Sequence, residues 1–156
     1  MAERFNLARR HGAKPDTTKG LPHMQLTQHG RDEIVEQLHN WAFALFGVSN
    51  EESAISVPGA RALVMHDSIE CNHHAFMVGR EFAHIHPHPD SGSMHVVLSS
   101  EDATEIVDKG WGEDHYLVTA GKWPHGLVMV FSPRNHDELE TVKSILNRSY
   151  QFARTT

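Results

Sequence analysis

The feature that most constrains the fold is a run of short strand-like segments enclosed by two helical ones. Between residues 53 and 131, short stretches rich in β-branched and aromatic residues alternate with turn residues and are interrupted by one helical segment. This order lacks the regular strand–helix alternation of a doubly wound fold. We therefore expect the α+β class: a single-domain two-layer fold, with an antiparallel sheet covered by helices on one face and a pocket on the other.

The strands and helices are expected from side-chain periodicity and from turn residues. Pro58 and Gly59 mark a tight turn between the first two strands. The expected strands cover residues 53–57, 61–65, 73–79, 82–86, 94–99 and 126–131. The expected helices cover residues 31–46, which Gly47 ends, then 99–110, which opens with a capping box, and a last helix that begins near Asn135.

Composition limits the classes of function. The chain has 156 residues, a formal net charge of −6 with neutral histidine, and one cysteine. We expect an extended N-terminal arm at residues 1–29, rich in Pro, Gly and Thr, and one domain at 30–156. No basic stripe is present to bind nucleic acid, and no apolar run approaches the ~20 residues of a membrane span. With one cysteine and no signal-peptide pattern, a cytoplasmic location is expected.

Histidine is the unusual residue of this chain, with 14 copies. On a strand, His84 and His86 of the segment "REFAHIHPHPDSGSMH" share one face, and an antiparallel return brings His95 beside them. Three imidazoles on an open face suit a divalent metal such as Fe, Mn, Cu or Zn, to which Asp90 can add a carboxylate. His88, between two prolines, is expected to be exposed.

A second interpretation needs no metal. His84 then forms a hydrogen bond with Glu81 or a backbone carbonyl, and His86 is solvated. Haem is a further alternative, because histidine also binds haem iron, although no attachment motif is present. The sequence leaves these three possibilities open.

Other polar groups adjoin the strands and turns. The candidate catalytic residues are Glu81, Glu113 and His115, and the candidate substrate-binding residues are Arg80, Trp111 and Arg134. Each also has a structural interpretation. Arg80 and Glu81 can form an ion pair, Trp111 can fill the edge of the core, and Arg134 can pair with Glu113.

Several blocks together resemble a known family. "ISVPGARAL", "FMVGREFAHIHP", "GSMHVVLS", "KGWGE", "VMVFSPR" and "SYQFA" are similar, in collinear order over roughly residues 20–153, to the small luciferase-like domain family of bacteria and fungi. The resemblance implies an oxygen-dependent, luciferase-like activity. The family's motif positions fall on Arg80, Glu81, His84, His86, His95, Trp111, Glu113, His115 and Arg134. Tyr116 and Asn135 depart from the Pro and Asp usual in the family.

Three functional hypotheses follow. In the first, the protein is a small-molecule oxidoreductase whose histidines hold a metal that activates O₂ or water, while carboxylates and His115 move protons and arginines fix an anionic group. In the second, the same pocket binds a small molecule without catalysis. In the third, the arm at residues 1–29 docks on a partner or on a second copy of the chain, giving a homo-oligomer.

Overall fold

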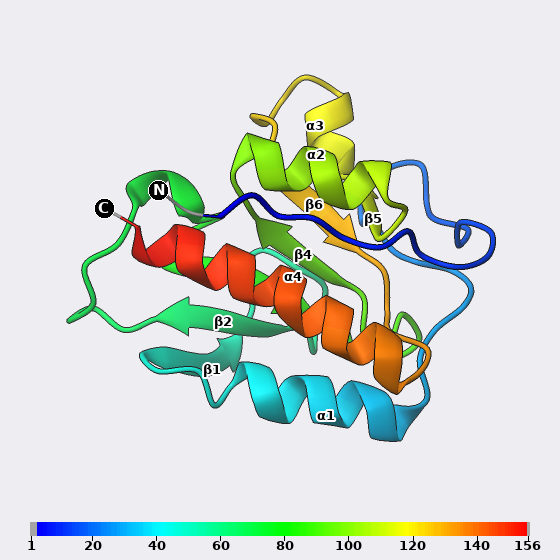
Figure 1. The fold of residues 1–156 in the computed structure, drawn as a ribbon. Coiled ribbons are helices and arrows are strands. Elements are labelled where there is room, and N and C mark those ends of the chain that lie inside the picture. The colour runs from blue at the N-terminus through cyan, green and yellow to red at the C-terminus, as the bar shows by residue number, and fades with distance from the viewer. Residues whose placement is uncertain (1–2, 156) are drawn as a thin grey trace.

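One antiparallel sheet organises the chain. A computed structural model describes residues 3–155 (Figure 1). Its elements are α1 (Asp32–Ala42), β1 (Val48–Glu52), β2 (Arg61–Met65), a 3-10 turn (His73–Ala75), β3 (Glu81–Ile85), β4 (Met94–Val97), α2 (Ser100–Asp108), β5 (Gly112–Asp114), α3 (Tyr116–Thr119), β6 (Leu127–Val130) and α4 (His136–Arg154). The six strands run in the order β1-β2-β3-β4-β6-β5, and each neighbouring pair is antiparallel. The predicted α+β class is confirmed.

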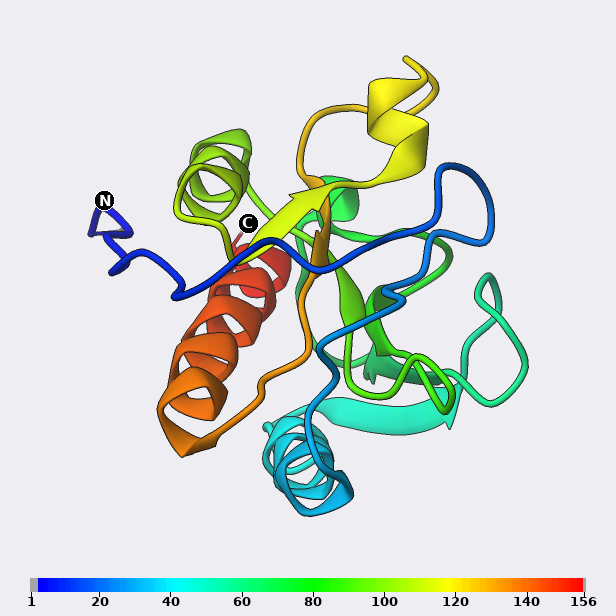
Figure 2. The ribbon, with the colours of Figure 1, turned by 90° about the vertical axis from the view of Figure 1, so that its right-hand side faces the viewer.

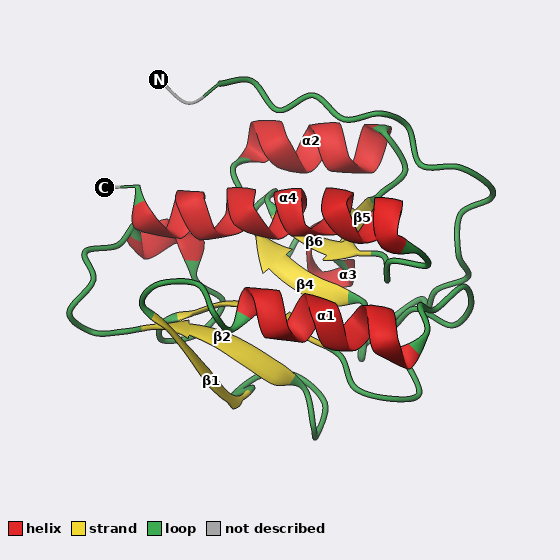
Figure 3. Cartoon of the chain, turned by 60° about the horizontal axis from the view of Figure 1, so that its bottom comes forward, coloured by secondary structure: helices red, strands yellow, loops and turns green. Residues whose placement is uncertain are grey.

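The long helices share one face of the sheet. Figure 2 shows α1, α2 and α4 on one side, and in Figure 3 α1 and α4 lie next to each other. α4 packs on β3 and β4, α2 packs on β5 and β6, and α1 packs against α4. Their apolar sides contribute to the main core, which includes Ile34, Leu38, Phe82, Leu139, Val142 and Leu146. Within residues 3–155, no helix combines the length and the apolar composition needed to cross a membrane. The opposite face of the sheet is left for the arm and for a cavity.

Helix boundaries follow the capping residues. The side chain of Ser99 accepts a hydrogen bond from the backbone N–H of Asp102, and that of Asn135 accepts one from Glu138. The predicted starts of α2 and α4 are therefore correct to within a residue. The first helix is shorter than predicted and ends at Ala42 instead of residue 46.

Three segments differ from the sequence prediction. Residues 53–57 form a connection, and the partner of β2 is the preceding segment, Val48–Glu52. This edge strand reads VSNEE and is largely exposed, so it carries no apolar alternation by which to recognise it. Residues 73–79 contain the 3-10 turn instead of a strand, and residues 112–114, which lie outside every expected strand, form β5.

The described part of the N-terminal arm crosses the molecule. It first runs along α2, where the backbone N–H of Arg10 donates to the carbonyl of Lys109 at 2.9 Å (Figure 1). It then reaches the sheet face opposite the helices, as Figure 2 shows. There His23 and Gln25 are almost fully buried. The arm therefore forms one wall of the cavity on this face of the sheet.

At the end of the arm, the backbone of Gly30 packs closely against the backbone of Pro133, and a substitution can test this contact. A Cβ atom on Gly30 would lie 1.9 Å from the carbonyl oxygen of Pro133, whereas one on Gly20 meets nothing within 4 Å. We expect Gly30→Ala to lower the free energy of unfolding by about 1–3 kcal/mol or more, because the backbone must shift to relieve the overlap. Gly20→Ala is the matched control. Equal urea-unfolding midpoints for the two variants would contradict this packing.

Candidate functional site

A cavity of about 440 Å³ lies on the sheet face opposite the helices. Its walls are mainly apolar, and five histidines form most of its polar part. The lining residues are Leu21, Pro22, His23, Met24, Ile55, Ser56, Val57, Met77, His84, His86, His95, His115, Leu117, Trp123 and Leu127. Among residues 3–155, no lysine or arginine lines it. The cavity therefore suits an uncharged, largely apolar ligand that presents one polar group to the histidines.

The two central strands bring three of the predicted histidines together. His84 on β3 is paired directly with His95 on β4, and His86 follows the end of β3. Their ring centroids lie 4.9 Å (His84–His95), 4.4 Å (His86–His95) and 5.4 Å (His84–His86) apart. All three are at most 6% exposed. The structure thus brings together the three histidines that the sequence spacing predicted. The second interpretation expected a solvated His86, and this expectation is wrong because His86 is buried.

A β-bulge places Glu81 beside this cluster. Strict alternation would put Glu81 and His84 on opposite faces of β3. Between β2 and β3, however, the pairing shifts from Leu63–Ala83 to Val64–Glu81, so that Phe82 is an extra residue. The Glu81 carboxylate thereby reaches Nδ1 of His84 at 2.8 Å. This is the hydrogen bond that the second interpretation expected, and it also orients the ring.

His86 has a carboxylate partner of the same kind. Its Nδ1 lies 3.1 Å from Oδ2 of Asp90 and 2.8 Å from the hydroxyl of Ser93, which itself donates to Asp90 at 2.7 Å. Asp90 is buried behind the imidazole and supports it from outside, instead of adding a ligand to the cluster. His88, by contrast, is exposed, as expected, and pairs with Asp32.

In each ring of the cluster, the nitrogen that faces the other rings carries no proton when the ring is neutral. Nε2 of His95 lies 3.0 Å from the carbonyl oxygen of His23, which can only accept, so this nitrogen carries the proton. Nδ1 of His84 likewise donates to a carboxylate. In the neutral rings, Nε2 of His84 and Nδ1 of His95 then present lone pairs to each other at 3.0 Å. Nε2 of His86 is buried and has no hydrogen-bond partner within the described chain.

Protonation of His84 and His95 is disfavoured. Burial lowers the pKa of His84, an effect that Glu81 offsets only in part, and burial together with the neighbouring imidazoles holds the pKa of His95 well below its usual range. Burial raises the pKa of Glu81 and of Asp90, but the hydrogen bonds that each carboxylate accepts outweigh it and leave both pKa values lowered. Neutral imidazoles at His84 and His95, beside ionised carboxylates, are thus the favoured state.

Three converging lone pairs form a set that a cation can occupy. The nitrogens of the cluster lie within 4.8 Å of one another. Two imidazole nitrogens that each lie about 2.0–2.1 Å from one ion, at roughly a right angle, are separated by about 3 Å. Metal-binding histidines usually donate their other N–H to a carboxylate or a backbone carbonyl, as all three do here. The residues therefore fit a metal ion.

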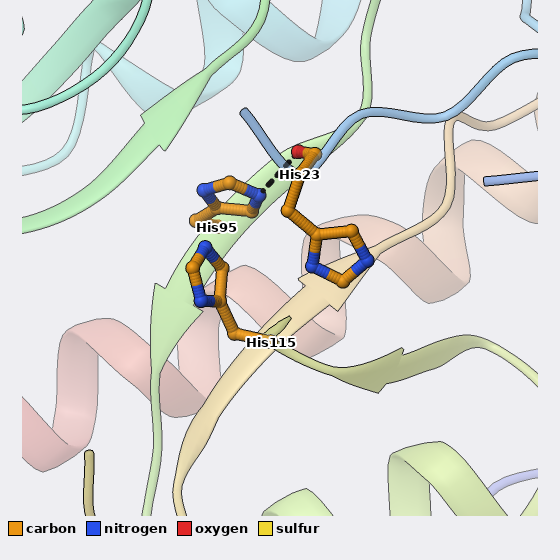
Figure 4. Close-up of side chains that lie close together, drawn as sticks. All are labelled: His23, His95 and His115. Carbon is orange, nitrogen blue, oxygen red and sulfur yellow. Dashed lines mark hydrogen bonds between the residues drawn. The ribbon is translucent and has the colours of Figure 1, made fainter. Parts of the chain in front are cut away.

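A second group of histidines fits a metal less well. Candidate ligand atoms of His23, His95 and His115 also lie within 4.8 Å of one another. Figure 4 shows these three side chains close together. Both ring nitrogens of His23 are already used, since Nδ1 accepts from the backbone N–H of Tyr116 at 3.1 Å and Nε2 donates to Glu113 at 3.0 Å. His95 directs its N–H to this side. No pair of free lone pairs therefore converges there.

His115 instead offers a hydrogen-bond donor to the cavity. Its Nδ1 accepts from the backbone N–H of Leu117 at 3.1 Å and caps α3, so Nε2 carries the proton of the neutral ring. Burial, with the charges of neighbouring histidines, lowers the pKa of His115 to about 4. The ring stands edge-on to His95 at 4.4 Å (Figure 4). Of the three candidate catalytic residues, it alone lines the cavity.

The two glutamates act behind the histidines. Glu81 holds His84, and Glu113 holds His23 and lies 3.3 Å from Lys14. Neither of these carboxylates lines the cavity. Their geometry is that of positioning groups.

The three candidate substrate-binding residues also lie elsewhere. Arg80 donates to the backbone carbonyls of Met65, His66 and Ile69. The indole N–H of Trp111 donates to the carbonyl of Ala8 at 2.7 Å, and its ring belongs to the core on the helical side. These contacts explain both residues structurally.

Arg134 is committed to a different partner from the one expected. It forms an ion pair with Glu138, at 2.6 Å, and not with Glu113. It also donates to the side chain of Gln28 and to the carbonyl of His11 in the arm. The sequence predicted that Arg134 binds an anionic group of a substrate. In the structure, Glu138 in the first turn of α4 supplies the carboxylate that Arg134 binds.

Comparison with known proteins supports a luciferase-like domain. Residues 79–149 match the family described as the luciferase domain. Over 75 residues, the chain is 38% identical to the luciferases of Armillaria gallica and Armillaria mellea and 35% identical to that of Neonothopanus nambi. The family resemblance expected from the motifs is thus confirmed for this part of the chain.

These matches are partial. The aligned segment is 47% of this chain and 28% of the length of each of these luciferases. No solved structure matches. The matched segment contains His84, His86, His95 and His115, whereas the arm that carries His23 lies outside it.

A variant of Arg80 tests its structural assignment. We expect Arg80→Ala to lower the free energy of unfolding by about 1–3 kcal/mol, because it removes hydrogen bonds to several backbone carbonyls. Binding of metal or small molecules to the folded variant should be unchanged. Arg31→Ala, which breaks only an exposed pair with Glu33, is the control. Loss of binding without loss of stability would return Arg80 to the binding site.

Proposed function

We propose that the protein is a small-molecule oxidoreductase that binds one divalent metal ion through His84, His86 and His95. Its substrate is an uncharged, mainly apolar molecule held in the adjoining cavity. The similarity to luciferases suggests molecular oxygen as the oxidant. A bound ion of this kind supplies Lewis acidity and, where it is a redox metal, electrons.

The observation that carries the proposal is the set of buried lone pairs. Two imidazole nitrogens face each other at 3.0 Å while their outer nitrogens donate elsewhere, and Nε2 of His86 is buried without a partner in the described chain. Leaving such polar groups unsatisfied is unfavourable. A proton shared between His84 and His95 would satisfy the two facing nitrogens, but burial disfavours the positive charge that this proton adds. It would also leave Nε2 of His86 without a partner in the described chain.

Charge balance supports the same conclusion. The carboxylates of Glu81 and Asp90 are buried and ionised, and their ion-pair partners among the described residues are histidines instead of lysines or arginines. Buried charges are stable only when they are paired or contact a metal. A divalent cation held by the histidines neutralises both carboxylates through the rings.

A mononuclear ion suits this geometry better than haem. Haem iron takes one or two axial ligands from the protein, whereas three imidazole nitrogens converge on one point here. Three protein ligands leave coordination positions open, as in catalytic metal sites. We therefore favour a single Fe, Mn, Cu or Zn ion.

The residues of the chain have separate roles around such an ion. Glu81 and Asp90 hold two ligand rings in orientation, and the apolar walls exclude water from the substrate. His115 presents its Nε2–H in the cavity and can donate a hydrogen bond to oxygen atoms of a bound substrate. No arginine lines the cavity in the described residues, so an anionic substrate group is not part of this proposal.

A non-catalytic binding domain is the second candidate. The apolar cavity alone is compatible with it. It leaves the facing lone pairs of His84 and His95 without a purpose, however. We rank it below the metalloenzyme for that reason.

Metal content is the first test. We expect tag-free protein to hold near-stoichiometric Fe, Mn, Cu or Zn by plasma mass spectrometry, and His84→Gln and His86→Gln to lose it while remaining folded by circular dichroism. His88→Gln changes the exposed member of the same segment and should keep the metal. Substoichiometric metal that is the same in all four proteins, with no gain on adding divalent ions, would leave the binding domain as the better account.

Ligand class is tested by filling the cavity. Val57 lines it, whereas Val78 is exposed and does not. We expect the uncharged dye Nile red to bind the wild type at one site, and Val57→Trp to weaken this binding by about tenfold or more because the indole takes up cavity volume. Val78→Trp is the matched control. Tighter binding of an anionic dye than of Nile red would contradict an apolar, uncharged substrate.

A further inference from the structure

We infer that residues 23–29 of the N-terminal arm are a working part of the metal centre: they position two of its three ligands, His86 and His95, from behind. The consequence for metal affinity rests on the proposed function, whereas the positioning itself does not. The luciferase-domain match at residues 79–149 does not include this segment. The role therefore belongs to a part of the chain that the family comparison leaves unassigned.

The first contact fixes the tautomer of His95. The carbonyl oxygen of His23 accepts from Nε2 of His95 at 3.0 Å (Figure 4). Because a carbonyl cannot donate, the proton stays on Nε2 and Nδ1 keeps its lone pair toward His84. The His23 backbone is itself anchored, because the two ring nitrogens of His23 contact Glu113 and the backbone N–H of Tyr116.

The second contact fixes the carboxylate behind His86. Oδ2 of Asp90 accepts from the backbone N–H of Gln25 at 3.0 Å, and Oδ1 lies 3.1 Å from Nε2 of His29. The same nitrogen of His29 lies 2.9 Å from the carbonyl oxygen of Gln25. Because a carbonyl only accepts, Nε2 of His29 carries a proton and is a donor to Asp90. Asp90 in turn contacts His86 and Ser93. The arm thus supplies two of the donors that orient this carboxylate.

The side chain of Gln25 ties the arm to the sheet. Its Oε1 accepts from the backbone N–H of Ser132, just beyond β6, at 2.9 Å, and its amide N–H groups donate to the carbonyls of Thr27 and Gln28. Arg134 and Arg10 both donate to the side chain of Gln28. Arg134, predicted from the sequence to bind substrate, therefore holds the arm instead.

The N-terminal arm also forms part of the cavity wall. Leu21 and Met24 of the arm line the cavity together with Ile55 of the β1–β2 connection. Leu21 is 61% exposed and Ile55 is 49% exposed, although both line the cavity, so they lie at its mouth. A shift of the arm would then change access for the substrate and the orientation of His86 and His95 together.

The test uses His29, which can be changed without touching a ligand. His29→Phe removes the donor to Asp90, and His29→Gln retains an N–H donor as the conservative variant. His11→Phe makes the same substitution at an exposed arm position as control. In metal-free, full-length protein, hydrogen exchange of the imidazole N–H groups is followed by ¹⁵N NMR.

We expect the Nδ1–H of His86 to exchange about tenfold faster or more in His29→Phe, with recovery in His29→Gln. The Nδ1–H of His84 is the internal standard, because Glu81 holds it with no contribution from the arm. Gln25→Ala, which frees the arm from Ser132, should accelerate exchange at both His86 and His95. Equal acceleration at His84 and His86 would mean general destabilisation and would overturn the inference, as would no change at all.

Metal binding is measured separately, with Zn²⁺ alone as the probe in competition with a chelating dye. Loss of the direct partner of a ligand typically weakens metal affinity 10–100-fold. His29 acts one residue further out, through Asp90, so we expect a decrease of about tenfold, the lower end of this range, for His29→Phe and none for His11→Phe. Unchanged Zn²⁺ affinity in His29→Phe would overturn the coupling of arm and metal. A wild type that binds no Zn²⁺ would count against the proposed function, while the exchange result would still decide the role of the arm.

Discussion

The pairing of His84 with His95 across two central strands is the contact on which the rest of the site depends. Both strands are buried on both faces, so every imidazole nitrogen between them must find a partner inside the protein. The outer nitrogens are satisfied by a bulge that turns Glu81 and by the carbonyl of His23. The inner ones are left facing each other. The unusual features around the site, including a bulge in a central strand and an arm laid over the sheet, can be understood as ways of meeting this requirement.

Stability and function make opposite demands on such a cluster. A core of this size would be more stable with apolar side chains in place of three imidazoles and two carboxylates, because each buried polar group must be desolvated. The helical face shows that alternative, since Leu139, Val142 and Leu146 form a continuous apolar core there. The two layers therefore have different roles. The helices and their side of the sheet stabilise the domain, and the opposite side bears the unfavourable polar groups.

The sequence predicted what depends on local periodicity. The helix starts at Ser99 and Asn135 and the shared face of His84 and His86 all follow from patterns within a few residues. It could not predict Glu81 on the histidine face, because a bulge breaks the alternation on which that inference relies. It also missed His23, whose role depends on where an arm without periodic pattern crosses the sheet. That path is decided by contacts between residues far apart in the chain, such as His23 and His95.

The origin of the lining residues bears on how such a domain can vary. The three proposed ligands and His115 come from the segment that matches the luciferase domain family, whereas Leu21, Met24, Ile55 and Val57 come from segments outside it. Loops and arms tolerate change better than paired central strands, because fewer buried contacts constrain them. In this arrangement the reactive groups are set by the strands and the shape of the cavity is set by the arm and the β1–β2 connection. Ligand preference can therefore diverge between relatives while the histidine cluster stays the same.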